Sequence, residues 1–218
     1  MQYINRQYPL TEEEKLKREQ EIEAREHAQR MSNNRLGITI LQISWMMTFI
    51  ALIVVYWQLG FSEGWRPSAD LAPNPIIPAV ATLVIIISGY FARQGWKIAL
   101  HTEAKSKVNH QPAFQQPWLI AIILGFIFFG MMIQQLFAIP FGDAPELRFT
   151  MIYRLMIGYH ALHALVTLLM MGHIYRSGAD HRYNEANYWA LEGLAKLWYF
   201  VIIAWLLFYA VLYTPFLS

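Results

Sequence analysis

The stretch MIYRLMIGYHALHALVTLLMMGHIYR, residues 151–176, decides the fold. It is apolar, and it exceeds the length of about 20 residues that an α-helix needs to cross a bilayer. It also contains Arg154, His160, His163 and His173. Polar groups are costly in lipid, so ionisable residues inside a span indicate a functional site by default. His160 and His163 share one helical face because they are three residues apart. We expect that face to contact something other than lipid.

The composition of the whole chain also indicates a membrane protein. Of its 218 residues, 56% are hydrophobic and 15% are charged, and the apolar residues come in blocks of about 20. The chain has no cysteine, which excludes disulfides, thiolate nucleophiles and iron–sulfur ligation. Its net charge of +2 is too small to indicate a nucleic-acid partner. The composition therefore predicts a polytopic α-helical membrane protein.

Apolar segments of bilayer-spanning length recur along the chain. Together with the polar or Gly/Pro-rich sequence between them, they predict an all-α membrane protein with five transmembrane helices in a bundle. The expected spans are residues 36–59, 75–92 with an amphipathic continuation to 101, 118–139, 151–176 and 194–213.

The N-terminal segment is the polar part of the chain. Thr11 and Glu14 have the spacing of a capping box, and three acids precede a base by four residues, which is the stabilising order. We therefore predict a charged, solvated helix over residues 1–35 that lies on the membrane or on a partner, followed by a membrane domain over residues 36–218. The three pairs are Glu14/Arg18, Glu21/Arg25 and Glu26/Arg30.

Lysine and arginine are distributed unevenly between the two ends of the spans. Fourteen of the 17 basic residues fall in the N-terminal segment, the second-to-third loop and the fourth-to-fifth loop with their flanks, and three fall on the opposite side. By the positive-inside rule, the N-terminus is predicted to be cytoplasmic and the C-terminus to lie outside.

The histidines of residues 151–176 allow three interpretations. Haem ligation would require a partner histidine at matching depth on another span, and the first, third and fifth spans contain none. A proton relay usually combines histidine with carboxylates, and no Asp or Glu lies in the middle of a span. We favour the third interpretation, in which His160 and His163 hydrogen-bond to neighbouring helices or to lipid.

Other polar side chains in the spans also need partners. The neutral glutamines at 134–135 suit interhelical hydrogen bonds, worth about 0.5–2 kcal/mol each. Arg154 lies near the outer end of its span and is expected to reach the headgroups, in preference to pairing with Asp143 or Glu146. Together with Gln42 and the two histidines, these groups indicate contacts to lipid or to adjacent helices. The lack of ionisable mid-span groups elsewhere favours a non-catalytic subunit over a pump or channel.

Several motifs resemble one family. GYHALHALVTLL, residues 158–169, resembles the span of haem–copper oxidase subunit III that reads roughly GFHGLHVIIGTL, with Gly158, His160 and His163 on its Gly and two His. EGLAKLWYFVIIAWLLFYAVLY, residues 192–213, resembles the terminal span of that family. The matching residues outside the histidine motif are Leu36, Gly37, Ser44, Leu124, Gly125, Glu192, Trp198, Phe200, Val201 and Trp205, with Ser88 and Gly89 at a small-residue pair.

The resemblance implies a subunit without catalytic residues or a metal of its own. It implies the five-span bacterial form, in which two groups of helices enclose a cleft that holds phospholipid. The implied partners are oxidase subunit I above all, subunit II, a small subunit IV and membrane lipids. Haems and copper are then expected in the partner subunits, and the location is the bacterial inner (plasma) membrane.

The chain departs from the family pattern where the family carries acids. Its membrane Glu is replaced by Trp45, the Glu of a later span by Gln135, and the Asp of the terminal motif by Ile202. The resemblance therefore implies packing, lipid holding and subunit I contact in a cytochrome c or quinol oxidase. A haem-b membrane anchor of another respiratory complex, and a small transporter or assembly factor, remain the alternatives.

Overall fold

The computed structural model describes residues 11–61, 72–101, 113–139, 146–178 and 188–214. These residues form five α-helices, each long and apolar enough to cross a membrane, and this described part of the chain contains no strand. The prediction of an all-α membrane fold is confirmed. The helices are α1 (Glu12–Gly60), α2 (Ile76–Leu100), α3 (Gln115–Ala138), α4 (Glu146–Gly178) and α5 (Trp189–Tyr213).

The helix bounds follow from local sequence chemistry. Pro78 and Pro117 lie in the first turns of α2 and α3, where a backbone N–H has no intrahelical acceptor and a proline is therefore tolerated. At the start of α1 the predicted capping box is present. Thr11 Oγ1 accepts a hydrogen bond from the Glu14 N–H at 3.3 Å, and Glu14 Oε2 accepts one from the Thr11 N–H at 2.8 Å. The pKa of Glu14 is lowered first by the hydrogen bond from the Thr11 backbone N–H and then by one from the Thr11 hydroxyl, which lies 3.0 Å from Oε2.

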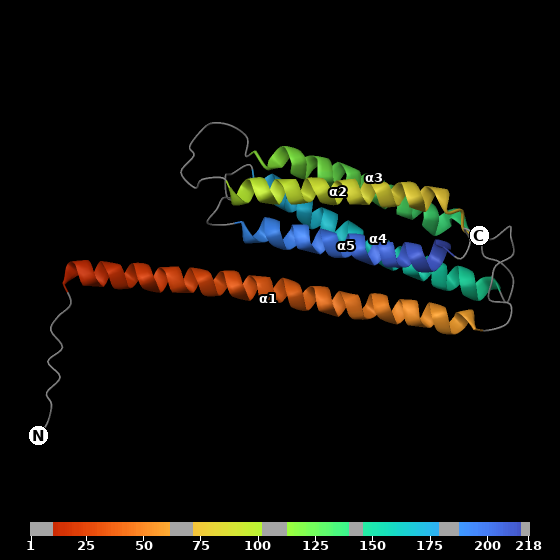
Figure 1. Ribbon diagram of the computed structural model, residues 1–218, viewed down its shortest axis with the longest axis horizontal. Helices are drawn as coiled ribbons and strands as arrows, with labels where there is room; N and C mark the ends of the chain where they lie inside the picture. Colours follow the sequence, from red (N-terminus) through yellow and green to blue (C-terminus); the bar gives the residue numbers. More distant parts are fainter. Residues whose placement is uncertain (1–10, 62–71, 102–112, 140–145, 179–187, 215–218) are drawn as a thin grey trace, which may run out of the picture.

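The charged N-terminal segment and the first span form one continuous helix. α1 has 49 residues and is therefore about 73 Å long, against roughly 30 Å of hydrocarbon. The boundary predicted at residue 35 coincides with no break in the helix. Of the three predicted acid–base pairs, the described structure forms Glu26–Arg30, with 3.1 Å between Oε2 and Nη2. Figure 1 shows the N-terminal half of α1 extending past the ends of the other helices.

Helices α2 to α5 make a bundle, and α1 runs along one side of it (Figure 1). α2 packs on α3 and α5, α4 packs on α3 and α5, and the main neighbour of α1 is α5. The apolar part of α1 is consequently the least buried of the spans. The largest fully buried side chains of the bundle are aromatic and include Trp118, Trp198, Trp205, Tyr153 and Phe128.

Candidate functional site

His160 lies at the centre of the protein, where α4 meets α1, α3 and α5. Its side chain is fully buried, and its ring is surrounded by those of Phe49 at 5.7 Å, Phe128 at 5.9 Å, Trp205 at 5.5 Å and Phe208 at 6.0 Å between centroids. Neither ring nitrogen has a hydrogen-bond partner among the described residues. The predicted hydrogen bond from His160 to a neighbouring helix is wrong, because the surrounding helices present aromatic rings there.

His163, one turn further along α4, faces α1. Its Nδ1 lies 2.7 Å from the carbonyl oxygen of Tyr159, a residue of the same helix. Its ring packs edge to face on Trp45, with 4.3 Å between the centroids. The hydrogen bond expected to a neighbouring helix is therefore made within α4, where the carbonyl four residues back is in reach. The two histidines both contact protein, whereas His173 is exposed at the far end of α4.

The surroundings of His160 do not fit a haem. The imidazole is fully buried, and a porphyrin bound to it would have to displace the rings of Phe49, Phe128 and Trp205, whose centroids lie 5.5–5.9 Å from its own. An imidazole buried without partners carries an unrecovered desolvation cost of about 1–3 kcal/mol.

We expect His160→Leu to leave the thermal midpoint of the purified chain unchanged or to raise it, because an apolar side chain removes that desolvation cost. Thermal unfolding in detergent measures this effect. The matched variant His173→Leu, on the exposed part of α4, should leave the midpoint unchanged. A fall of the midpoint in His160→Leu alone would show that the imidazole has a polar partner.

Uncharged side chains occupy the three positions at which the resemblance to the family implies acids. Trp45 lies between His163 and Phe200, with 4.3 Å and 6.1 Å between the centroids. Gln135 is buried, and its Oε1 accepts a hydrogen bond from the Tyr153 hydroxyl at 3.2 Å. Ile202 is buried against the backbone of α2, where a Cβ built on Gly89 would lie 2.5 Å from Ile202 Cδ1. These positions therefore serve helix packing in this chain.

Arg154 joins α4 to the end of α3. Its Nη2 donates a hydrogen bond to the carbonyl oxygen of Ile139 at 2.6 Å. This contact is to protein, and the expected reach of Arg154 to the headgroups stays a prediction. Asp143 and the side chain of Glu146, the less favoured partners, lie outside the described residues. A Cβ added to Gly158, on the same helix, would lie 3.5 Å from Leu136 Cδ1, which is an ordinary van der Waals contact.

Two tryptophans of the family motif hydrogen-bond α5 to α2. The indole N–H of Trp198 donates to Ser88 Oγ at 3.0 Å, and this hydroxyl donates to the Ala121 carbonyl of α3 at 2.7 Å. The indole N–H of Trp205 donates to Thr82 Oγ1 at 2.9 Å. In a membrane, such bonds contribute about 0.6 kcal/mol each on average. They fix the register between helices whose apolar surfaces alone do not specify it.

Gly37 and Ser44 do not pack within the described chain. Both are exposed on α1, and nothing lies within 4 Å of a Cβ added to Gly37. The Ser44 hydroxyl donates to the carbonyl of Ile40 in its own helix at 3.0 Å. The prediction of packing is therefore wrong for these two residues inside the chain, because they lie on the face of α1 that is turned away from the bundle.

A charged cluster joins α1 to α5 at the end of the apolar spans. The carboxylate of Glu192 is 8% exposed; Arg35 Nη2 lies 2.8 Å from its Oε2 and Lys196 Nζ lies 2.7 Å from its Oε1. Arg35 Nη2 also donates to the Tyr188 hydroxyl at 3.1 Å. The resemblance to the family predicts a packing role for Glu192. The ion pair of Glu192 with Lys196 could have been predicted from the sequence, because the acid precedes the base by four residues on one helix. The pair of Glu192 with Arg35 could not, because these residues are 157 positions apart in the chain.

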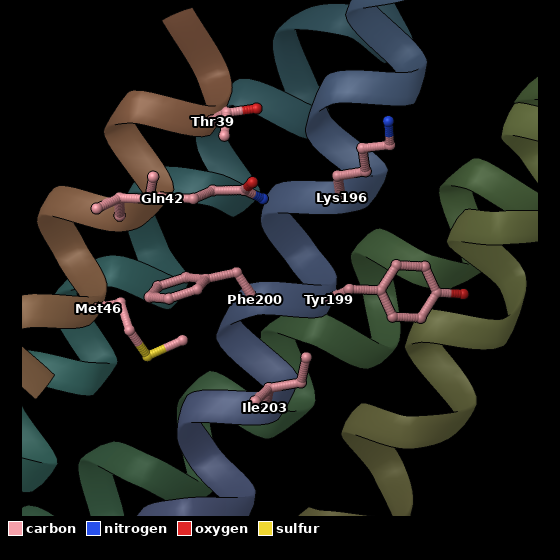
Figure 2. A pocket seen from close by; sticks show the side chains of 8 residues that line it. Thr39, Gln42, Met46, Lys196, Tyr199, Phe200 and Ile203 are labelled. Atoms are coloured by element: carbon pink, nitrogen blue, oxygen red, sulfur yellow. The ribbon is translucent and has the colours of Figure 1, made fainter. Parts of the chain in front are cut away.

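Next to this cluster, an apolar groove of about 390 Å³ runs between α1 and α5. Figure 2 shows the Thr39 hydroxyl and the Gln42 amide of α1 pointing toward α5, with the Phe200 ring between the two helices. Gln42, predicted to contact lipid or a helix, therefore lines a groove instead of joining the core. The groove is lined by Thr39, Gln42, Ile43, Met46, Lys196, Tyr199, Phe200 and Ile203.

Fold and site together define a multi-pass helical membrane protein with an aromatic core and, among the residues that the structure describes, an ionic contact between α1 and the bundle. Residues 13–215 match the family model described as cytochrome c oxidase subunit III. The chain belongs to the cytochrome c oxidase subunit III family, and hence to the proteins that assemble into an oxidase complex with other subunits. This membership confirms the resemblance seen in the sequence and does not support the haem-anchor or transporter alternatives.

Two curated relatives agree with this assignment. A cytochrome c oxidase subunit 3 of Thermostichus vulcanus is 25% identical over 180 residues, which cover 82% of this chain and 85% of the relative. A cytochrome c oxidase subunit 3 of Synechocystis sp. (strain ATCC 27184 / PCC 6803 / Kazusa) is 21% identical over 179 residues, which cover 81% of this chain and 73% of the relative.

Proposed function

We propose that this chain is the non-catalytic subunit III of a bacterial haem–copper terminal oxidase, which reduces oxygen and translocates protons. In this proposal it binds and stabilises catalytic subunit I, with subunit II and a small subunit IV as further neighbours, and it holds membrane lipid. The haems and copper belong to the partner subunits. The chain crosses the plasma membrane with its N-terminus in the cytoplasm and its C-terminus outside.

One observation carries the non-catalytic part of the proposal. At the three positions where the family has membrane acids, the chain has Trp45, Gln135 and Ile202, and each is engaged in packing or in a neutral hydrogen bond. Proton transfer through a membrane interior normally uses carboxylates or histidines that face a water-filled path. His160 is instead enclosed by aromatic rings. The interior is thus suited to rigid packing.

The surface of α1 supports the binding part of the proposal. In the single chain it exposes a long apolar face that includes Leu36, Ile40, Met47 and Val54. Within a bilayer, exposed apolar surface can be covered by lipid or by a neighbouring helix, and helix association depends on close packing and small residues. Gly37 and Ser44 lie exposed on the same helix, and they suit a contact with another subunit.

We expect an oxidase complex stripped of this chain to retain oxygen reduction at first and to lose it faster during turnover. The reason is that a stabilising subunit limits local opening of its neighbour without contributing to the reaction centre. Oxygen consumption recorded over successive turnovers measures both quantities. Immediate and complete loss of activity on removal would contradict the proposal, as would unchanged durability. Adding back the purified chain serves as the control and should restore the durability.

A further inference from the structure

The N-terminal half of α1 separates its charges around one exposed isoleucine. Ile22 is 48% exposed, and its neighbours on the helix surface are the residues three and four positions away. At about 100° per residue, these neighbours lie about 40–60° to either side of it. One side carries Arg18 and Arg25, and the other carries Glu19 and Glu26. The surface therefore consists of an arginine row, an apolar centre and a glutamate row.

Three of these four charges form no ion pair within the described part of the chain. They are Arg18, Glu19 and Arg25, whereas Glu26 pairs with Arg30 of the same helix. All four are exposed, and the segment extends past the ends of the other helices (Figure 1). Rows of opposite charge on one helix are complementary to the same two rows on a second copy, when that copy faces the first across a two-fold axis parallel to the helix.

The same arrangement recurs around Ile40, in the apolar half of α1. Ile40 is 56% exposed; it lies about five turns beyond the first isoleucine and so points in the same direction. The flank that continues the arginine row carries Leu36 and Ile43, which are 58% and 59% exposed. The flank that continues the glutamate row carries Gly37 and Ser44, which are also exposed. Here the two rows differ in size, as the earlier rows differ in charge.

This separation by size is not shared by the exposed face of α2. The corresponding residues there are all large, namely Val80, Leu83, Ile86 and Ile87. Lipid covers such a surface without close packing, whereas a row of small residues lets the backbone of a second helix approach. The face of α1 is therefore suited to a helix, and its charged rows specify which one.

We propose that α1 forms a two-fold symmetric contact with α1 of a second copy of this chain. Copies in one membrane share their orientation, so the two helices are parallel. The arginine row of each copy then faces the glutamate row of the other, and the large row faces the small row. Arg25 lies level with the partner's Glu26, and Leu36 with the partner's Gly37, to within one residue or about 1.5 Å. An antiparallel pair would bring like charges together.

The contact is compatible with the rest of the fold. Gly37 and Ser44 lie on the face of α1 that is turned away from the bundle, and α1 runs along one side of the bundle (Figure 1). The two bundles therefore lie on opposite sides of the α1 pair. The subunit that Gly37 and Ser44 contact is then the second copy, and the exposed faces of α2, α3 and α4 remain for subunit I of the proposed function.

Disulfide crosslinking of the full chain in its native membrane, with all its partners present, tests the contact. The chain has no cysteine, so Ile22→Cys and Ile40→Cys each place a single thiol at the two-fold axis. After oxidation we expect a covalent dimer of this chain from both variants. Ala24→Cys, an exposed position about 160° around the helix from Ile22, should give none. A product with a different polypeptide would overturn the proposal, as would an equal dimer yield from Ala24→Cys.

Exchange of the charges tests the pairing of the rows. In the Ile22→Cys background, Arg18→Glu with Arg25→Glu replaces the four ion pairs of the dimer by repulsions. Each exposed pair contributes about a factor of two, so the dimer yield should fall roughly tenfold. Adding Glu19→Arg and Glu26→Arg exchanges both rows, restores their complementarity and should restore the yield. A yield that stays low would show that the rows do not face each other. The haem spectrum of the same membranes reports the proposed function separately, because dimers without haem contradict only that function.

Discussion

Replacing Gly125 with leucine is expected to destabilise the bundle more than any other single change considered for this chain. A Cβ added to Gly125 would clash with Leu168 Cδ2 of α4, and it would lie 3.0 Å and 3.2 Å from two ring atoms of Trp198 in α5. Leu168 and Trp198 are both fully buried. Because α3, α4 and α5 meet at this glycine, a larger side chain must push two helices apart.

The expected size of the effect follows from overpacking. Extra methylenes in a close-packed core cost about 1–3 kcal/mol, and leucine adds enough volume to place Gly125→Leu at or above about 3 kcal/mol. For a chain of this length that corresponds to a fall in the thermal midpoint of roughly 6–12 °C. Thermal unfolding of the purified chain in detergent measures it. Gly125→Ala should give a smaller loss in the same direction.

The matched control lies five residues further along the same helix. Gly130 is exposed, and nothing lies within 4 Å of a Cβ added there. Gly130→Leu should therefore leave the midpoint unchanged, although its helix propensity and hydrophobicity change as much as in Gly125→Leu. Equal midpoints for the two variants would show that the three helices can separate at Gly125 without cost.

The contrast between these two glycines shows what the sequence could and could not predict. Apolar length predicted the five spans, because bilayer thickness alone sets that length. It could not say which helical face is covered, since a span exposed to lipid and a span buried in protein are equally apolar. Gly37 and Ser44 are exposed, whereas Gly125, which belongs to the same set of family-motif residues, lies in the core.

Some contacts of the polar residues could be predicted from the sequence and others could not, for a similar reason. The capping box at Thr11 and Glu14 depends on neighbours three residues apart, so spacing reveals it. The surroundings of His160 depend on rings from three other helices, and the motif that carries the histidine contains none of them. Contacts within a helix can be predicted from spacing, and contacts between helices require the packing.

We expect Glu192→Gln to loosen α1 from the bundle. Glutamine keeps the shape and one acceptor oxygen of the side chain but leaves Arg35 and Lys196 without a counter-charge. Removing one member of a buried ion pair costs about 3–5 kcal/mol. Because the side chains of Arg35 and Lys196 are 48% and 49% exposed, solvent screens them, and the expected loss is smaller, about 1–2 kcal/mol.

The loss of the ion pairs should affect the position of α1, because α5, which carries Glu192, is the main neighbour of α1. Apart from this cluster, the contacts that hold it include Trp45 on His163 and Phe49 on Tyr159. The chain has no cysteine, so spin labels attached at Asn33→Cys and Lys97→Cys give a distance between α1 and α2 without background. In Glu192→Gln that distance distribution should broaden and shift to longer values in detergent and in bilayers.

Glu26→Gln is the control for this experiment. It removes the ion pair of Glu26 with Arg30, whose side chains are 60% and 75% exposed on the same helix, and exposed pairs of this kind contribute only about 0.3–0.5 kcal/mol. The distance distribution should stay unchanged there. If Glu192→Gln also leaves it unchanged, the aromatic contacts of Trp45 and Phe49 suffice to hold α1, and the charged cluster is not needed for that contact.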